Sequence, residues 1–217
     1  MCATPETATG ATPLSRCRLL CDDTAGPVAT WREHLGTADR IEVEIGCGRG
    51  TFLLSEARRR PECGFLGVET SGKWAQLAAL ALAAANLGNA AVVRAEAVEF
   101  LRSWVATESV QAVHVYFPDP WPRGRHEKRR IWRPEFVREV LRILSPGGRI
   151  LTATDIRGYF VAIQALLTAQ PGLEQRMMPG SWPLTVYAQK FLERGRPVFS
   201  TMFVKLPSAP LHEDDVA

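Results

Sequence analysis

Residues 41–50, IEVEIGCGRG, join a strand-forming run to three alternating glycines. Ile41–Ile45 is predicted to form a strand that ends in these glycines. The residues from Thr51 to about Arg60 are predicted to form a helix. Glycine lets the backbone turn sharply and approach a ligand closely. The stretch therefore predicts a strand, a tight turn suited to a ligand, and a helix.

The same alternation of short apolar runs and helical patterns continues along the chain. Strands are predicted over Gly64–Glu69, Ala91–Arg94, Val110–Phe117, Arg149–Thr154 and Pro197–Leu206, and helices over Lys73–Leu87, Val98–Val105, the residues from Pro134 onward and Tyr159–Thr168. Ser145-Pro146-Gly147-Gly148 is expected to end the helix before it and to turn the chain. Strand–helix alternation predicts an α/β fold, with a mostly parallel sheet, helices on both faces and ligands at the carboxyl ends of the strands.

Length and composition agree with one globular domain. The chain has 217 residues, of which 46% are hydrophobic and 23% charged, and this excludes wholesale disorder and collagen-like or coiled-coil architectures. We expect a flexible N-terminal extension over residues 1–30, a domain over 31–206 and a tail over 207–217. No apolar run reaches about 18 residues, which argues against a membrane span. The N-terminus has no signal-peptide pattern, and the five cysteines form no C-x-x-C, so we expect reduced thiols in a cytoplasmic protein without a metal.

The spacing of the glycines indicates which cofactor the turn binds. A dinucleotide fingerprint counted from Gly46 needs a glycine at position 51, where this chain has Thr51. The observed spacing through Gly46, Gly48 and Gly50 is G-x-G-x-G with Glu44 just upstream, which is typical of S-adenosylmethionine (SAM) methyltransferases. A nicotinamide cofactor remains an alternative, although it lacks its own glycine pattern.

Two further carboxylates follow the next two predicted strands. Glu69 lies nineteen residues after Gly50, where a carboxylate can accept hydrogen bonds from both ribose hydroxyls of an adenosine-type cofactor. Glu96 follows the third strand, where it can lie near an adenine edge. Each could instead be a solvated charge at a strand end, but three such residues at successive strand ends favour a cofactor site.

The fourth predicted strand leads into Phe117-Pro118-Asp119-Pro120-Trp121, a turn with a carboxylate between two prolines. Proline fixes φ, so this turn is stiff and Asp119 is held in place at the strand end that faces the cofactor. The alternative is a structural proline-rich turn beside a core tryptophan.

A basic segment comes directly after that turn. Residues 122–133 contain six basic side chains and one acidic side chain in a protein whose net charge is only +3; the basic residues are Arg123, Arg125, Lys128, Arg129, Arg130 and Arg133. Such a cluster favours contacts with the phosphates of a nucleic acid beside the reacting base. A solvated loop is the alternative.

The string FPDPWPRGRHEKRR, residues 117–130, resembles the signature of the bacterial tRNA (guanine-N7)-methyltransferase family. The similarity also includes Thr154–Phe160 and covers roughly residues 41–205. It implies a Rossmann-like SAM methyltransferase fold with an antiparallel C-terminal strand, SAM as cofactor and tRNA as partner. The implied reaction is that of a tRNA (guanine(46)-N(7))-methyltransferase, which acts on N7 of a variable-loop guanine.

The resemblance also implies roles for individual residues. The SAM-binding positions correspond to Glu44, Glu69, Glu96 and Asp119, together with Gly46 and Gly48 of the turn. Asp119 also matches the family's proposed active-site residue, and the substrate-binding positions match Arg123, Asp155 and Thr185. Where the family carries T-x-[FY]-E, this chain reads Thr185-Val186-Tyr187-Ala188, so the glutamate expected beside the guanine is absent.

Guanine N7 is a lone pair without a proton, so methyl transfer needs alignment with the sulfonium methyl and no base. We therefore expect Asp119 to position the substrate and to stabilise the cationic product ring. Two other functions stay open: methylation of another RNA or of a small molecule, and RNA binding with weak catalysis.

Overall fold

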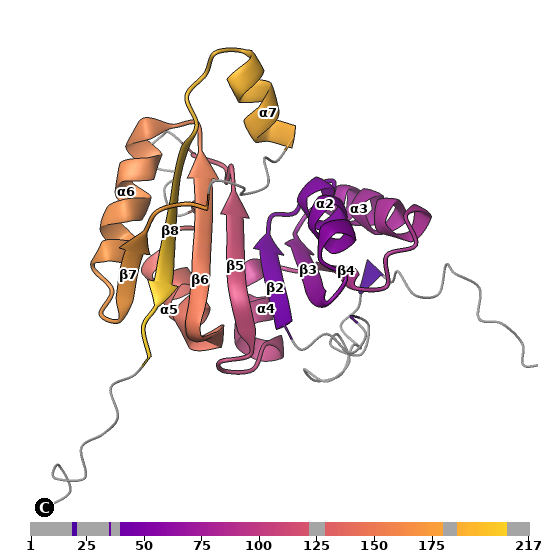
Figure 1. The fold of residues 1–217 in the computed structure, drawn as a ribbon, viewed down its shortest axis with the longest axis horizontal. Coiled ribbons are helices and arrows are strands. Elements are labelled where there is room, and N and C mark those ends of the chain that lie inside the picture. Colours follow the sequence, from indigo (N-terminus) through magenta and orange to yellow (C-terminus); the bar gives the residue numbers. More distant parts are fainter. Residues whose placement is uncertain (1–18, 21–34, 36–39, 122–128, 180–185, 208–217) are drawn as a thin grey trace, which may run out of the picture.

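The computed structural model of the chain describes residues 19–20, 35, 40–121, 129–179 and 186–207. In this part of the chain, eight strands form one sheet in the order β1-β4-β3-β2-β5-β6-β8-β7 (Figure 1). The strands are β1 (Leu19–Leu20), β2 (Arg40–Ile45), β3 (Cys63–Glu69), β4 (Ala90–Arg94), β5 (Val110–Tyr116), β6 (Leu144–Thr154), β7 (Leu173–Arg176) and β8 (Phe199–Lys205). Almost all of the expected N-terminal extension and C-terminal tail lies outside the described residues.

The sheet is parallel from β1 to β6, and β8 pairs with β6 and β7 in the antiparallel direction. The predicted antiparallel C-terminal strand is therefore confirmed. Strand β2 pairs in parallel with both β3 and β5, so the strand order reverses at β2. In open α/β sheets, such a reversal creates a crevice at the carboxyl ends of the strands, where ligands bind.

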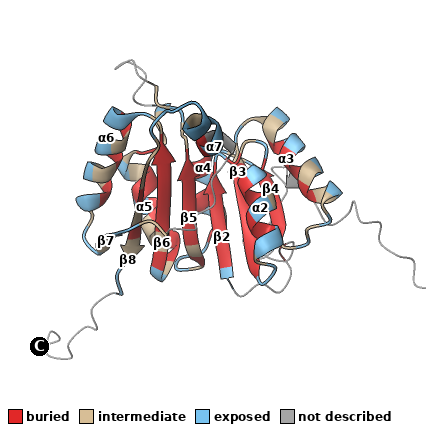
Figure 2. Cartoon of the chain, turned by 45° about the horizontal axis from the view of Figure 1, so that its top comes forward, coloured by how far each residue is buried: buried red, intermediate tan, exposed pale blue. Residues whose placement is uncertain are grey.

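Helices cover both faces of the sheet. Two of them, α2 (Thr51–Arg59) and α3 (Gly72–Ala84), contribute to a core cluster on one face, whereas α4 (Ala97–Trp104), α5 (Pro134–Ile143) and α6 (Arg157–Thr168) contribute to the larger cluster on the other. A further helix, α7 (Val186–Glu193), follows the parallel part of the sheet in the sequence and lies at the same end as the tips of β5 and β6 (Figure 1). The central strands are covered on both sides and are buried along most of their length (Figure 2).

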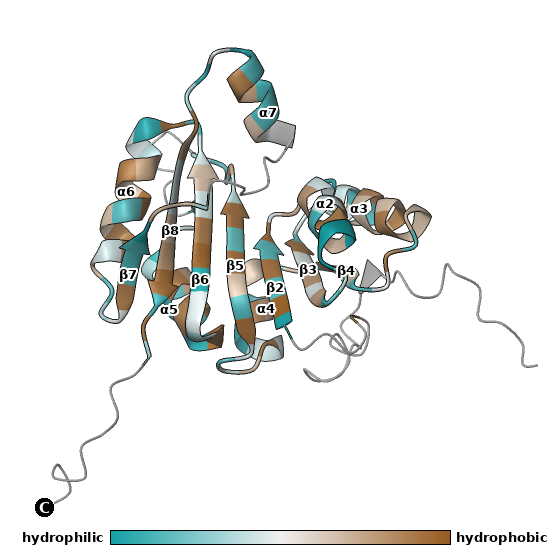
Figure 3. Cartoon of the chain, viewed as in Figure 1, coloured by the Kyte–Doolittle hydropathy of each residue, from teal (hydrophilic) through white to brown (hydrophobic). Residues whose placement is uncertain are grey.

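Burial on both faces explains the composition of these strands. Parallel strands between two helical layers read as nearly continuous apolar runs, and Figure 3 shows apolar residues along the central strands. The largest fully buried side chains are phenylalanines from three different elements, Phe65, Phe136 and Phe203. Full burial of one such side chain contributes about 1.5–3 kcal/mol.

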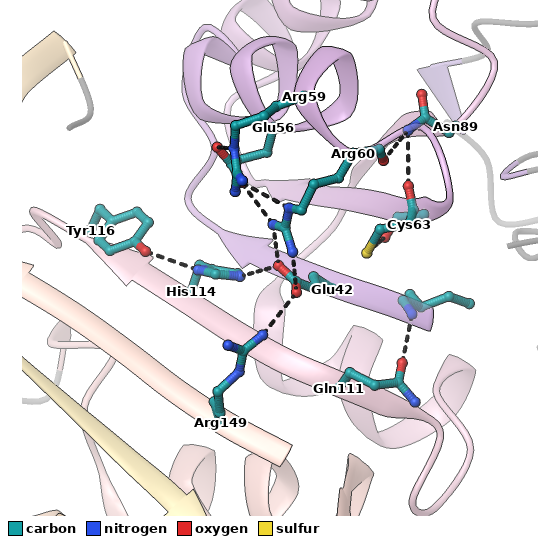
Figure 4. A network of polar contacts seen from close by, with 12 residues as sticks. Glu42, Glu56, Arg59, Arg60, Cys63, Asn89, Gln111, His114, Tyr116 and Arg149 are labelled. Atoms are coloured by element: carbon teal, nitrogen blue, oxygen red, sulfur yellow. Dashed lines mark hydrogen bonds and ion pairs between the residues drawn. The ribbon is translucent and has the colours of Figure 1, made fainter. Parts of the chain in front are cut away.

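One buried charge lies on the α2/α3 face of β2, near the amino end of the strand (Figure 4). Both Glu42 oxygens accept hydrogen bonds from Arg60, at 2.7 Å each, and one lies 3.2 Å from Arg149 Nη2. His114 Nε2 is 2.9 Å from the other oxygen, and His114 Nδ1 is 2.9 Å from the Tyr116 hydroxyl. Despite burial, the hydrogen bonds and positive charge of these partners hold the pKa of Glu42 well below its ordinary value. The buried carboxylate is therefore compensated.

The segment Ser145-Pro146-Gly147-Gly148 differs from its prediction as a turn between a helix and a strand. Helix α5 does end at Ile143, but the next residue, Leu144, already pairs with Val110 of β5. Pairing resumes between Ala112 and Arg149, so the four residues bulge out of β6. Gly147 has a φ of 77°, and Ser145 Oγ donates a hydrogen bond of 2.8 Å to the Glu108 carbonyl, which ties the bulge to the residues before β5.

Most predicted elements are confirmed within two residues, and the exceptions have local causes. Helix α3 ends three residues earlier than expected, at Ala84, and Asn86 takes a φ of 52°. Strands β1 and β7 and helix α7 were not predicted. The first is two residues long, and β7 shows no alternation of buried and exposed residues. No helix in the described residues has the length and apolar character needed to cross a membrane.

Candidate active site at the carboxyl edge

The glycine turn connects β2 to α2 through backbone conformations that favour glycine. Gly46, Gly48 and Gly50 have φ of 73°, 52° and 70°. The Gly46 N–H donates a hydrogen bond of 2.7 Å to the Val68 carbonyl, which fixes the turn to the end of β3. A Cβ on Gly50 would lie 3.0 Å from the Ala78 Cβ of α3, whereas one on Gly46 or Gly48 would meet no atom within 4 Å. The first half of the turn therefore borders open space that a ligand can approach.

Glu69 at the end of β3 is hydrogen-bonded to this turn. Its Oε2 accepts a bond of 2.9 Å from the Gly48 N–H, and its Oε1 accepts one of 2.9 Å from the Ser71 N–H ahead of α3. Each carboxylate oxygen can accept more than one hydrogen bond, so both oxygens retain capacity for ligand hydroxyls. The carboxylate expected to bind ribose is thus already oriented.

Glu44 is a buried carboxylate with an unused oxygen. Only 5% of the residue is exposed, and its Oε2 has no hydrogen-bond partner. Burial, and next the negative charge of Glu69, raise the pKa of Glu44 well above its ordinary value. Leaving such an acceptor buried and unsatisfied costs free energy, which a cationic donor bound beside the glycine turn would recover. This orphaned oxygen and the open space beside Gly46 fit the amino group and chain of an amino-acid-like cofactor such as SAM.

Glu96 is at the tip of β4, as expected, but its carboxylate already has a partner. It caps the N-terminus of α4, where Oε2 accepts a hydrogen bond of 2.9 Å from the Glu99 N–H. The residue is exposed, so a cofactor role and a capping role are compatible.

Asp119 lies in the turn after β5, at the same edge of the sheet. The residues on either side of the Pro118-Asp119-Pro120 tripeptide, Phe117 and Trp121, have φ of 50° and 37°, and the Asp119 side chain is exposed. The Phe117 ring packs against the Phe191 ring of α7, with 5.3 Å between centroids. The backbone N–H of Phe117 donates a hydrogen bond of 2.8 Å to the Ala153 carbonyl of β6. The carboxylate is therefore presented to solvent on a turn that is anchored at its start.

The basic segment is described only in part. Arg123 and Thr185, two of the three expected substrate contacts, lie outside the described residues. Arg129 is exposed, with its guanidinium 5.0 Å from the centre of the Trp121 ring. Arg130 is half-buried and donates to the Pro120 and Trp121 carbonyls. Arg130 is thus bonded to the backbone of the Asp119 turn, a contact that the sequence did not predict.

Asp155, the third expected substrate contact, follows β6 and pairs with a residue the sequence did not single out. Arg196 Nη2 lies 2.9 Å from Asp155 Oδ2, and the Arg196 guanidinium is 4.8 Å from the centre of the Phe191 ring. The pair links the end of β6 to α7. No local pattern marks Arg196, because its two partners are 5 and 41 residues away in the sequence.

Ala188 is fully buried within α7, at 0% exposure. Its methyl group is therefore enclosed by other residues in this structure, and the expectation that this position borders the guanine stays a prediction. Tyr159 of α6 is another residue that sequence reasoning missed. Its ring centre lies 5.2 Å from the guanidinium of Arg130, the residue that is bonded to the Asp119 turn, and burial raises the pKa of Tyr159 to about 12.

The topology thus brings five predicted carboxylates to one edge, at or just after the carboxyl ends of β2, β3, β4, β5 and β6; they are Glu44, Glu69, Glu96, Asp119 and Asp155. Within the described ranges, no group of three or more His, Cys, Asp and Glu side chains is arranged to hold a metal ion. The candidate site is therefore a group of carboxylates beside a glycine turn, at one edge of the sheet.

Comparison with known proteins supplies the family. A family model described as "Putative methyltransferase" matches residues 38–201. The tRNA (guanine-N(7)-)-methyltransferase of Syntrophotalea carbinolica is 33% identical over 205 residues, covering 91% of this chain and 87% of that protein. The protein of the same name from Alkalilimnicola ehrlichii is 36% identical over 174 residues, covering 77% and 73%.

Solved structures agree on the fold. The 16S rRNA methyltransferase KamB superposes with a TM-score of 0.59 at 17% identity, covering 82% of this chain and 94% of that one. The antibiotic-resistance methyltransferase Kmr gives 0.58 at 17% identity, covering 86% and 96%. The expected Rossmann-like SAM methyltransferase fold is confirmed. With its sheet order, its glycine turn and its similarity over most of its length to these relatives, the chain belongs to the tRNA (guanine-N(7)-)-methyltransferase family.

Proposed function

We propose that this protein transfers the methyl group of SAM to N7 of a guanine in tRNA. One observation carries the proposal: the glycine turn, the oriented Glu69 carboxylate and the stiff Asp119 turn meet at the carboxyl edge of one sheet. The names of the relatives support the same reaction. Among variable-loop guanines, position 46 is the target that we propose.

Three carboxylates would hold the cofactor, which supplies an electrophilic methyl group when bound. Glu44 would accept a hydrogen bond from its ammonium group through the unpartnered Oε2. Glu69 would accept from the ribose hydroxyls while it keeps its bonds to the Gly48 and Ser71 N–H groups. Glu96 would lie beside the adenine.

Asp119 would act on the guanine by charge and position. Methylation makes the purine ring cationic, and a carboxylate held beside the ring favours that developing charge. N7 carries no proton, so Asp119 need not act as a base. Because the residue is exposed, an incoming base can reach its carboxylate directly.

The substrate geometry requires an accessible guanine. In A-form RNA, N7 faces a deep, narrow groove that side chains do not enter, so the base must lie in a loop or leave its stack. A variable-loop guanine meets this condition. We propose that Arg123 and Arg129 contact tRNA phosphates, that Asp155 and Thr185 contact the guanosine, and that the protein works in the cytoplasm.

The experiment is methyl transfer from labelled SAM to an unmodified tRNA transcript, followed by mapping of N7-methylguanine through cleavage of the chain at modified sites. We expect one modified guanine, lost when position 46 is changed to adenine. A matched reaction with Asp119→Asn controls for contaminating activity. Modification of a different base or RNA would support the broader methyltransferase function instead. Binding of tRNA without any transfer would support an RNA-binding protein with weak catalysis, and would contradict the proposal.

A further inference from the structure

The turn that carries Asp119 has a conformation that its neighbours must maintain. Phe117 and Trp121, on either side of the tripeptide, both lie in the left-handed region, with φ of 50° and 37°. Bulky residues rarely adopt such values, and they persist only where the surrounding structure holds them. Pro118 and Pro120 have no N–H, so the turn has few donors with which to stabilise itself. The stabilising contacts must therefore come from elsewhere.

Arg130, which lies in the second half of the basic segment, supplies such contacts. Its Nε donates a hydrogen bond of 2.7 Å to the Pro120 carbonyl, and its Nη2 lies 3.2 Å from the Trp121 carbonyl. These are the carbonyls of the two residues that directly follow Asp119. A guanidinium is planar and presents its donors in a fixed fork, so a two-point contact sets both the position and the orientation of the peptide it holds.

Arg130 is itself held by rigid elements. Its guanidinium lies 5.2 Å from the centre of the Tyr159 ring, which belongs to α6 and is 5% exposed. Two residues further on, the Trp132 ring is buried and packs edge-to-face on Phe136 of α5, with centroids 5.3 Å apart. Because Arg130 is held against α5 and α6, its hydrogen bonds fix the Asp119 turn relative to these two helices.

We propose that Arg130 is a positioning residue that fixes the Asp119 turn for methyl transfer. The inference rests on the proposed function insofar as Asp119 acts on the guanine. It separates Arg130 from Arg129, its neighbour in the basic segment. Arg129 is exposed and stacks on the Trp121 ring, whereas Arg130 is half-buried and bonded to the backbone of the turn. In this proposal, Arg129 contacts RNA, whereas the adjacent Arg130 holds the turn that carries Asp119.

The first test compares Arg130→Ala, Arg130→Lys and Arg138→Ala, the last an exposed arginine of α5 as a matched control. With saturating tRNA and SAM, we expect Arg130→Ala to lower the single-turnover rate at least about tenfold, and Arg138→Ala to keep the parent rate. Arg130→Lys should recover part of the rate, because lysine keeps a donor but not the fork. The salt dependence of tRNA binding should not change in Arg130→Ala, whereas Arg129→Ala should lower its log–log slope by roughly 0.7–0.9.

A double-mutant cycle with Asp119→Asn tests whether Arg130 acts through that residue. If it does, Arg130→Ala should cost little further rate once Asp119 is already changed. Additive losses would overturn the inference, as would a parent-like rate in Arg130→Ala.

Hydrogen exchange on the free protein gives a readout that does not need activity. The peptide spanning residues 116–121 should exchange faster in Arg130→Ala and Arg130→Lys, while the peptides of β5 and α5 keep their protection. Unchanged exchange in this peptide, together with a lower salt slope, would make Arg130 an ordinary phosphate contact. If the parent protein transfers no methyl group, the proposed function fails, and hydrogen exchange still decides whether Arg130 holds the turn.

Discussion

Replacing Glu44 by glutamine should stabilise the free protein and weaken its binding of SAM. In the free protein, the Glu44 carboxylate is buried, lacks a partner for Oε2 and lies near the negative charge of Glu69. Its pKa is raised, so the folded state holds a proton that the unfolded chain releases near the ordinary value of 4.5. Stability is therefore lost as pH rises above about 4.5 toward the pKa of the folded state, and a neutral amide escapes this loss.

The size of the effect follows from this linkage. Each unit by which the folded pKa exceeds the unfolded one is worth about 1.4 kcal/mol at pH values above both. We therefore expect Glu44→Gln to be more stable than the parent at pH 8, and to differ little from it at pH 4.5. For a chain of this length, that gain corresponds to a rise in melting temperature of about 2–4 °C per kcal/mol. The lost charge-assisted bond to the SAM ammonium, about 1.5–3 kcal/mol, should raise the Kd for SAM roughly 10- to 100-fold.

Thermal unfolding at several pH values and calorimetric titration with SAM measure both effects. Glu42→Gln is a matched control, two residues earlier on the same strand and the same face. There the carboxylate is compensated by Arg60, His114 and Arg149, so the change should destabilise the protein by about 3–5 kcal/mol. The lowered pKa of Glu42 means that its contribution is present above about pH 4.5 and is lost as pH falls. A Glu44→Gln protein that melts lower at pH 8 and binds SAM as tightly as the parent would refute the reasoning.

Three further changes test the site. Glu69→Ala should weaken SAM binding at least about tenfold, because it removes the ribose acceptor and frees the Gly48 N–H; unchanged calorimetric affinity in a folded variant would reject the cofactor assignment. Asp119→Asn should remain folded and slow single-turnover methyl transfer at least about tenfold through lost charge stabilisation, and a parent-like rate would make Asp119 structural. Ala188→Glu places a carboxylate at a fully buried position, so it should lower the melting temperature; a stable variant with a lower KM for tRNA would instead place position 188 at the guanine.

Sequence reasoning placed these carboxylates at one edge of the sheet because their positions depend on local signals. Glycine spacing marks the turn after β2, and each acidic residue follows a run of buried, strand-forming residues. Once parallel order is inferred, the carboxyl ends of the strands share one edge, and Glu44, Glu69 and Asp119 are expected together without any knowledge of side-chain contacts.

Contacts between distant residues could not be predicted in the same way. Glu42 contacts Arg149, which is 107 positions away in the sequence, and Arg130 donates to carbonyls 9 and 10 residues away. In the sequence, Arg130 is one more cation in a basic run, and only the fold separates it from Arg129. The Ser145–Gly148 bulge shows the same limit, because proline and glycine signal an irregularity but not that pairing with β5 continues on both sides of it.

The two carboxylates of β2 show that the two ends of this strand differ in how substitutions would affect stability and SAM binding. Glu42, near the amino end of the strand, has its charge matched by three partners, while Glu44, at the carboxyl end, is left unmatched. Substitutions meant to raise the thermal stability should therefore be made near the amino ends of the central strands, around Glu42. Stronger ion pairing there does not touch the residues proposed to bind SAM. At the carboxyl ends of these strands, selection for thermal stability would instead favour neutral replacements of Glu44, which remove the negative charge proposed to bind the SAM ammonium group. Heat-resistant but inactive variants should accordingly accumulate changes at Glu44 and spare Glu42.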